Sequence, residues 1–225
     1  RITAVSNAFT IKNMTFPLIK KTSQGNRLLI FLLLLLFGLI FSSVLGFFVS
    51  MINGGSPTDL RNLRIIQVLS QVVGFMMPAV VYVLLVKEKP LNYLGFNSMP
   101  AWSLLGIVAM CTVIPFLSMV TDWNDSIVFP ESMRALEEQM RATQQKTEEV
   151  INMFISGGSL FSSLIIIAAL AAISEELLFR SVIQQALIKI FRNAHLAIIM
   201  TAIIFSAFHL DFFGFFPRAI LGLML

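Results

Sequence analysis

The 225-residue chain is 57% hydrophobic and only 12% charged, with a mean hydropathy of +0.86. Soluble domains average about 45–50% apolar and about 25% charged residues, so the composition indicates a polytopic membrane protein. The net charge of +4 comes from basic residues near the ends of apolar runs, which argues against a nucleic-acid-binding patch. The single cysteine, Cys111, excludes an intrachain disulfide.

The predicted elements begin with a polar, basic stretch, 1–27, followed by an uncharged run, 28–52. That run is longer than the roughly 7–15 residues of a signal-peptide core, so it predicts a retained membrane helix. The other predicted spans are 63–86, 101–121, a helix from Ser159, 194–210 and a helix from Pro217. A span needs about 20 residues, so we expect an all-α transmembrane bundle of about five complete spans plus the start of a sixth.

The distribution of lysine and arginine predicts the orientation, because these residues accumulate on the cytoplasmic side. If the spans alternate, one side receives the basic clusters 1–27, Lys87, Lys89, Lys189 and Arg192. We therefore expect a cytoplasmic N-terminus in a bacterial inner membrane, with 122–156 outside. Within that outer segment, 131–155 has helical apolar spacing. This fits an amphipathic helix on the membrane surface, and it also fits a lid or substrate-docking helix.

Three ionisable groups lie in "ISEELLFR" (173–180), directly after an uncharged apolar run. A charge at the centre of a span costs about 2.5–3.5 kcal/mol, so compensation is expected. Glu176 and Arg180 are four residues apart and can form an ion pair on one helix face. Glu175 is turned about 100° away from Glu176, which leaves it free to act chemically.

The next apolar run contains "FSAFH" (205–209), which places His209 one turn after Phe205. A reversal of the chain at Arg192–Asn193 would leave Glu176 and His209 about equally far from the turn, at about 25 Å. An antiparallel helical hairpin therefore predicts that Glu175, Glu176 and His209 meet at the same depth and form a polar pocket.

"EELLFR" (175–180) and "FSAFH" (205–209) resemble the EExxxR and FxxxH motifs of the CPBP intramembrane protease family. This family includes the type II CAAX prenyl proteases and Abi-like relatives with bacteriocin-processing or immunity roles. The resemblance covers roughly 160–225 and implies a third motif, a histidine with asparagine or aspartate four residues later. Because the sequence ends before such a motif, we expect a C-terminally truncated chain. The expected division is a basic cytoplasmic segment (1–27), N-terminal helices with the outer amphipathic segment (28–156) and a partial catalytic core (157–225).

The resemblance implies an intramembrane endopeptidase that hydrolyses a peptide bond with an activated water. Glu175 and His209 would activate the water, and Glu176 and Arg180 would support them. The residues of the third motif would bind the oxyanion. The expected partners are the lipid bilayer and a peptide or membrane-protein substrate, with no nucleic acid.

Three alternatives remain open at this point. No cofactor is certain, but Glu175 and His209 could instead ligate Zn²⁺, which in catalytic sites usually has three protein ligands and a water. Phe205 and Phe208 are either lipid-facing aromatics or part of a groove that binds an apolar substrate. Finally, ionisable residues inside membranes also mark transport pathways, so a transporter or a non-catalytic immunity or scaffold relative is the alternative function.

Overall fold

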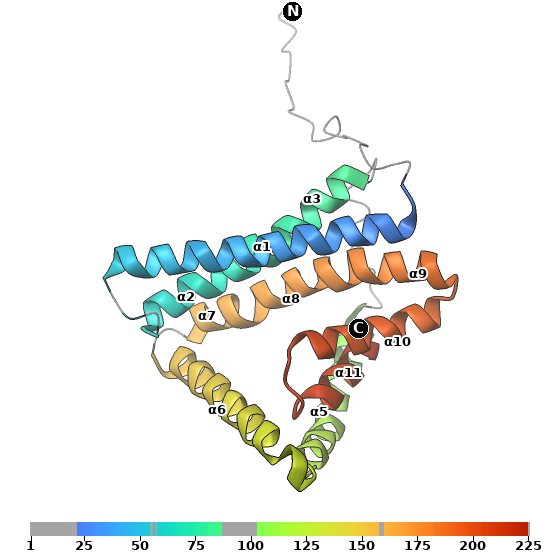
Figure 1. The fold of residues 1–225 in the computed structure, drawn as a ribbon. Coiled ribbons are helices and arrows are strands. Elements are labelled where there is room, and N and C mark those ends of the chain that lie inside the picture. The colour runs from blue at the N-terminus through green and yellow to red at the C-terminus, as the bar shows by residue number, and fades with distance from the viewer. Residues whose placement is uncertain (1–21, 55, 57, 87–102, 158–159, 225) are drawn as a thin grey trace, which may run out of the picture.

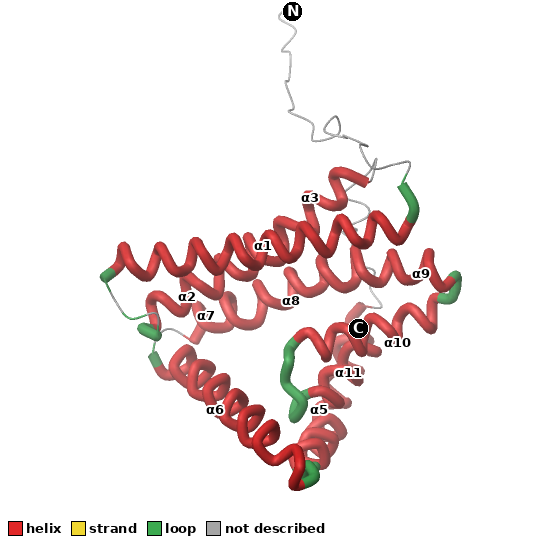
Figure 2. Tube along the Cα trace, viewed as in Figure 1, coloured by secondary structure: helices red, strands yellow, loops and turns green. Residues whose placement is uncertain are grey.

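The computed structural model describes residues 22–54, 56, 58–86, 103–157 and 160–224. Every regular element among these residues is a helix, which confirms the expected all-α class (Figure 2). The predictions made for most of the basic N-terminal segment and for Lys87 and Lys89 lie outside the described residues.

Three long helices are apolar enough to cross a membrane, counting only the part of the chain that the structure describes. The first is α1 (Gln24–Asn53), which begins where the Ser23 hydroxyl accepts a hydrogen bond from the Asn26 N–H, 3.3 Å away. The second is Leu60–Val86, made of α2 (Leu60–Leu69), η2 (Ser70–Met76) and α3 (Met77–Val86). The third is Phe161–Phe191, and together these helices cover the runs predicted at 28–52, at 63–86 and from Ser159.

The third helix runs through five elements: α7 (Leu160–Ser163), η4 (Leu164–Ala169), α8 (Leu170–Glu175), η5 (Glu176–Gln184) and α9 (Gln185–Phe191). The η elements in it, like η2, are π-helical, a rare geometry that is frequent at functional sites. No residue pattern in the sequence predicts them. The buried Ser174 donates a hydrogen bond to Gln71 of η2. This bond links the second and third long helices at the residue that precedes Glu175.

The predicted span at 194–210 is shorter in the structure, where α10 (Ala194–Phe208) has 15 residues. At about 1.5 Å per residue it covers about 22 Å, less than the hydrocarbon core of about 30 Å. The last helix, α11 (Phe215–Met224), begins two residues before the Pro217 expected to start it. The expected number of complete spans therefore stays a prediction.

The remaining helices frame the lower half of the molecule as drawn in Figure 1. Helix α5 (Ser103–Asp125), with Pro115 inside it, covers most of the predicted 101–121 span and packs against α11. The amphipathic helix predicted at 131–155 is confirmed as η3 (Glu131–Met133) and α6 (Arg134–Ser156). Helix α6 runs from the end of α5 back to the start of α7.

The buried core lies where α1, α3, η5 and α10 meet, and its fully covered members include Phe31, Ala79, Val83, Leu178 and Ala197. Close contacts between these buried apolar side chains hold the helices together at the centre of the bundle. The core fixes η5 and α10 relative to each other, and these are the elements that bear the predicted functional residues.

Candidate functional site

A tight reversal at Arg192–Asn193 confirms the predicted hairpin between α9 and α10. Arg192 adopts the left-handed conformation, with φ 54°, and ends α9. The Asn193 side chain then accepts a hydrogen bond from the Leu196 N–H at 3.2 Å, which caps the start of α10. The two helices therefore run antiparallel from this turn.

The hairpin brings Glu175 and His209 together, with 3.9 Å between Glu175 Oε1 and His209 Nε2. Glu175 is the last residue of α8, and His209 follows the last residue of α10. Their side chains are 32% and 31% exposed, so the pair is accessible to a small molecule while still lying against the bundle.

The hydrogen-bond partner of Nδ1 assigns the tautomer of the neutral His209 imidazole. His209 Nδ1 lies 2.9 Å from the Phe205 carbonyl oxygen, and a carbonyl only accepts hydrogen bonds. Nδ1 therefore carries the proton, and Nε2 presents a lone pair toward Glu175. Two acceptors separated by 3.9 Å can both receive hydrogen bonds from one water molecule. The arrangement is suited to orienting a water.

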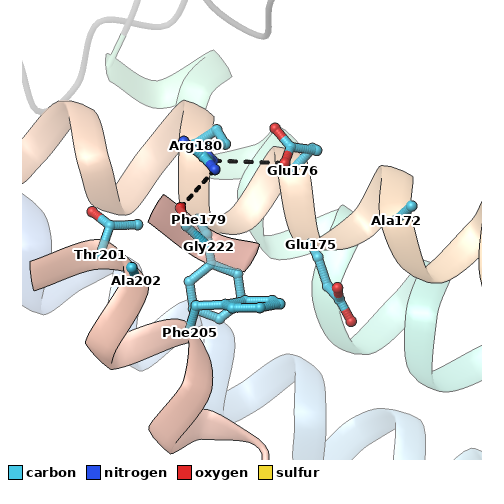
Figure 3. Close-up of a pocket in the computed structure, with 9 residues that line it drawn as sticks. All are labelled: Ala172, Glu175, Glu176, Phe179, Arg180, Thr201, Ala202, Phe205 and Gly222. Carbon is cyan, nitrogen blue, oxygen red and sulfur yellow. Dashed lines mark hydrogen bonds and ion pairs between the residues drawn. The ribbon is translucent and has the colours of Figure 1, made fainter. Parts of the chain in front are cut away.

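Glu176 forms the expected pair with Arg180, at 3.6 Å between carboxylate and guanidinium. Arg180 also donates to the Gly222 carbonyl of α11 at 2.9 Å, so it joins the helix of the two glutamates to α11 (Figure 3). In Figure 3 Glu175 points to the other side of its helix from Glu176, as the helical rotation predicted.

A cavity of about 190 Å³ lies between the glutamate helix, α10 and α11, and both glutamates, Arg180 and Gly222 line it. Its walls are mainly apolar. A Cβ atom at Gly222 would lie 3.1 Å from the Ala202 Cβ, so glycine permits α11 to approach α10 this closely. The cavity is small beside the roughly 300–1,000 Å³ typical of ligand pockets, and it suits water or one side chain better than a whole ligand.

The two phenylalanines proposed for substrate binding lie in different surroundings. Phe205 lines the cavity, packs against His209 at 5.0 Å between ring centroids and contacts Phe179 at 5.1 Å. Phe208 packs against Phe75 and Phe179, each at 5.8 Å, and is not among the residues that line the cavity. The structure thus brings Phe205, and not Phe208, to the site.

The structure also adds residues that the sequence analysis missed. Asp211 and Arg218 form an ion pair at 2.5 Å within the loop and first turn that follow His209. Two opposite charges seven residues apart, close to the candidate histidine, could have predicted this ion pair from the sequence. Asn124 of α5 binds the same loop, and nothing near position 124 in the sequence indicates that contact.

A catalytic zinc ion usually needs one more protein ligand than the described residues of this site offer. No group of three or more His, Cys, Asp or Glu side chains could hold a metal ion, within the residues that the structure describes. Glu175 and His209 supply two ligands, one fewer than catalytic zinc usually has. The residues described here do not fit a catalytic zinc site, so the chemistry below uses only the side chains themselves.

Comparison with known proteins gives a match to a protein family. Residues 157–225 match the family model described as type II CAAX prenyl endopeptidase Rce1-like. No curated protein and no solved structure matches the chain. The matched segment contains both glutamates, Arg180 and His209, and the match confirms the resemblance seen in their motifs.

Proposed function

We propose, from the premise that residues 157–225 belong to the CAAX protease family, that this chain is a membrane endopeptidase whose attacking water lies between Glu175 and His209. The observation that carries the proposal is the 3.9 Å separation of two acceptor atoms, Glu175 Oε1 and His209 Nε2. The Phe205 carbonyl fixes the imidazole tautomer that this arrangement requires.

In the proposed reaction, Glu175 takes a proton from the water while His209 Nε2 holds it in place. The resulting hydroxide attacks the carbonyl carbon of the peptide bond and forms a tetrahedral oxyanion. The carboxyl group then returns the proton to the departing amine, the C–N bond breaks, and the enzyme regains its starting form. The family resemblance assigns oxyanion binding to the family's third motif, a histidine with asparagine or aspartate four residues later.

Glu176 and Arg180 have a supporting role in this proposal. Their ion pair neutralises the second carboxylate, so Glu175 does not lie beside another uncompensated acid. The hydrogen bond from Arg180 to the Gly222 carbonyl joins two residues that line the cavity. Phe205 packs on the imidazole and would form the apolar wall next to the substrate backbone.

The apolar helices and the family match indicate an integral membrane protein. We place the N-terminus in the cytoplasm of a bacterial cell and take peptides or membrane proteins as the substrates. Labelling single cysteines with a membrane-impermeant reagent would test the orientation, because α6 should then react from outside the cell. Labelling of α6 only after permeabilisation would reverse the assignment.

The proposed function is tested with the full-length protein in lipid nanodiscs and a library of peptides analysed by mass spectrometry. Glu175→Gln and His209→Ala should each lower the cleavage rate by about 10²-fold or more, because each removes a group that handles the water proton. His195→Ala is the matched control, since His195 is the other histidine of the chain and lies exposed at the start of α10. Cleavage that persists unchanged in both Glu175→Gln and His209→Ala would refute the proposal.

A parent protein that cleaves nothing, and loses transport or partner binding on Glu175→Gln, would instead support the non-catalytic alternative. Ionisable side chains in a membrane protein also serve such pathways.

A further inference from the structure

We infer that Asn124, in the last turn of α5, is a positioning residue for the Glu175–His209 pair, because its side chain binds the middle of the loop that follows His209 and the first turn of α11. The catalytic consequence of this inference rests on the proposed function. The structural part of the inference, that Asn124 fixes the place of His209, is independent of the proposed function.

The Asn124 side chain is 0% exposed, and both ends of its amide are bound to backbone. Its Nδ2 donates to the Phe212 carbonyl at 3.1 Å, and its Oδ1 accepts from the Phe216 N–H at 3.2 Å. Phe216 is the second residue of α11, where backbone N–H groups have no intrahelical acceptor. Asn124 therefore caps α11 from a different helix, a task that a residue adjacent in sequence usually performs.

The held loop begins directly at the candidate histidine. His209 is the residue that ends α10, and its N–H still donates to the Ser206 carbonyl at 3.3 Å, so the chain leaves the helix directly after the histidine. Leu210, the next residue, has φ 52°, a conformation that residues other than glycine rarely adopt. Such a conformation persists only where the surrounding contacts enforce it. The loop from His209 to Phe215 thus depends on what binds it from outside.

Some of those contacts are local. Ser206 donates to the Phe215 carbonyl at 2.5 Å, and Asp211 accepts from the Phe213 N–H at 3.1 Å. These bonds set the shape of the loop but connect it only to neighbouring residues. The Asn124 bonds connect it to α5, a helix some 90 residues earlier (88 and 92 positions for the two bonds).

Aromatic packing surrounds the two residues that the buried Asn124 amide binds. Trp123 packs against Phe216 at 5.1 Å between ring centroids, and Phe129 packs against Phe212 at 4.9 Å. The Arg141 guanidinium of α6 lies 4.1 Å from the centre of the Phe213 ring. Hydrogen bonds covered in this way gain strength, because little water competes for their atoms.

The same amide influences two parts of the site. It holds the loop that follows His209. It also fixes the start of α11, whose Gly222 carbonyl receives Arg180. A displacement of about 1 Å in a catalytic group can lower a rate by about 10²-fold. Losing the Asn124 contacts should therefore reduce turnover without removing any group that touches the substrate.

The test compares Asn124→Leu and Asn124→Asp with the parent, using the full-length protein in nanodiscs. Leucine removes both hydrogen bonds, whereas aspartate keeps the acceptor for Phe216 and loses the donor to Phe212. Thr121→Val is the matched control, because Thr121 lies one turn earlier on α5 and bonds only within its own helix. Three quantities are measured: amide hydrogen exchange in 209–216, the rate at which diethyl pyrocarbonate modifies His209 relative to His195, and kcat and KM.

We expect Asn124→Leu to raise exchange in 209–216 by about tenfold or more, because two buried hydrogen bonds are lost. Modification of His209 should accelerate relative to His195. We expect kcat to fall by about 10- to 100-fold while KM changes by less than about twofold. Asn124→Asp should lie between leucine and the parent, and Thr121→Val should match the parent.

Unchanged exchange in 209–216 for Asn124→Leu would overturn the inference, and so would increased exchange without a fall in kcat. If Asn124→Leu also loses protection from amide hydrogen exchange in α1, the variant is globally unfolded. Asn124→Asp then decides the question by its exchange in 209–216 and its kcat. A parent protein without peptidase activity would refute the proposed function alone. Exchange and His209 modification would still decide whether Asn124 holds the histidine.

Discussion

Replacing Arg180 by methionine removes the charged group that joins the helix bearing both glutamates to α11. In the structure its guanidinium donates to the Gly222 carbonyl at 2.9 Å and lies 3.6 Å from the Glu176 carboxylate. A hydrogen bond from a charged donor contributes about 1.5–3 kcal/mol. The ion pair adds at most about 1 kcal/mol, because the Glu176 side chain is 53% exposed. The expected loss of unfolding free energy is therefore about 1.5–4 kcal/mol.

The chain contains a matched control for this variant. Arg134 and Glu138 of α6 have the same spacing of four residues and the same 3.6 Å separation, but both side chains are 73% exposed. Arg134→Met should cost less than about 0.5 kcal/mol. Both variants are measured by equilibrium unfolding in mixed micelles with increasing sodium dodecyl sulfate. If Arg180→Met and Arg134→Met differ by less than about 0.5 kcal/mol, the contact with α11 does not have the importance assigned to it.

Two further predictions concern α6 and α11. The Phe129 N–H, 3.0 Å from the Glu137 carboxylate, holds the pKa of that group below its ordinary value of 4.5. The ionised Glu137 carboxylate therefore stabilises the folded state at pH values above its ordinary pKa. This stabilisation is lost as the pH falls through the lower pKa that the group has in the folded state. Glu137→Gln should flatten the decline in unfolding free energy between about pH 5 and pH 3. Gly222→Ala should cost about 1–3 kcal/mol, because the added methyl would lie 3.1 Å from the Ala202 Cβ, whereas Gly106→Ala, with nothing within 4 Å, should be neutral or slightly stabilising in the same unfolding measurement.

The sequence predicted the central geometry of the site because helical rise is uniform. With a turn at Arg192–Asn193, counting residues to Glu175 and to His209 was sufficient to place them at one depth, and the structure separates them by 3.9 Å. The Glu176–Arg180 pair followed from a spacing of four residues in the same way. Both predictions depend only on the regular rise and rotation of an α-helix.

Features that depend on distant contacts were not predictable. The predicted 194–210 span overshoots α10 by two residues because Leu210 turns into the left-handed region without a glycine or proline to signal it. The bonds from Asn124 to the loop join residues that no local pattern relates. The π-helical geometry of η5 likewise depends on packing between helices, and its residues resemble those of an ordinary α-helix.

The contact made by Asn124 has a consequence for how such sites can be recognised. Its amide binds only main-chain atoms, the carbonyl of Phe212 and the N–H of Phe216. Every residue except proline offers the same main-chain N–H and carbonyl, so positions 212 and 216 can take other residues, apart from proline at 216, with the same donor and acceptor present. Pairwise covariation between alignment columns records side chains that change together, and it would therefore assign no link between position 124 and either partner.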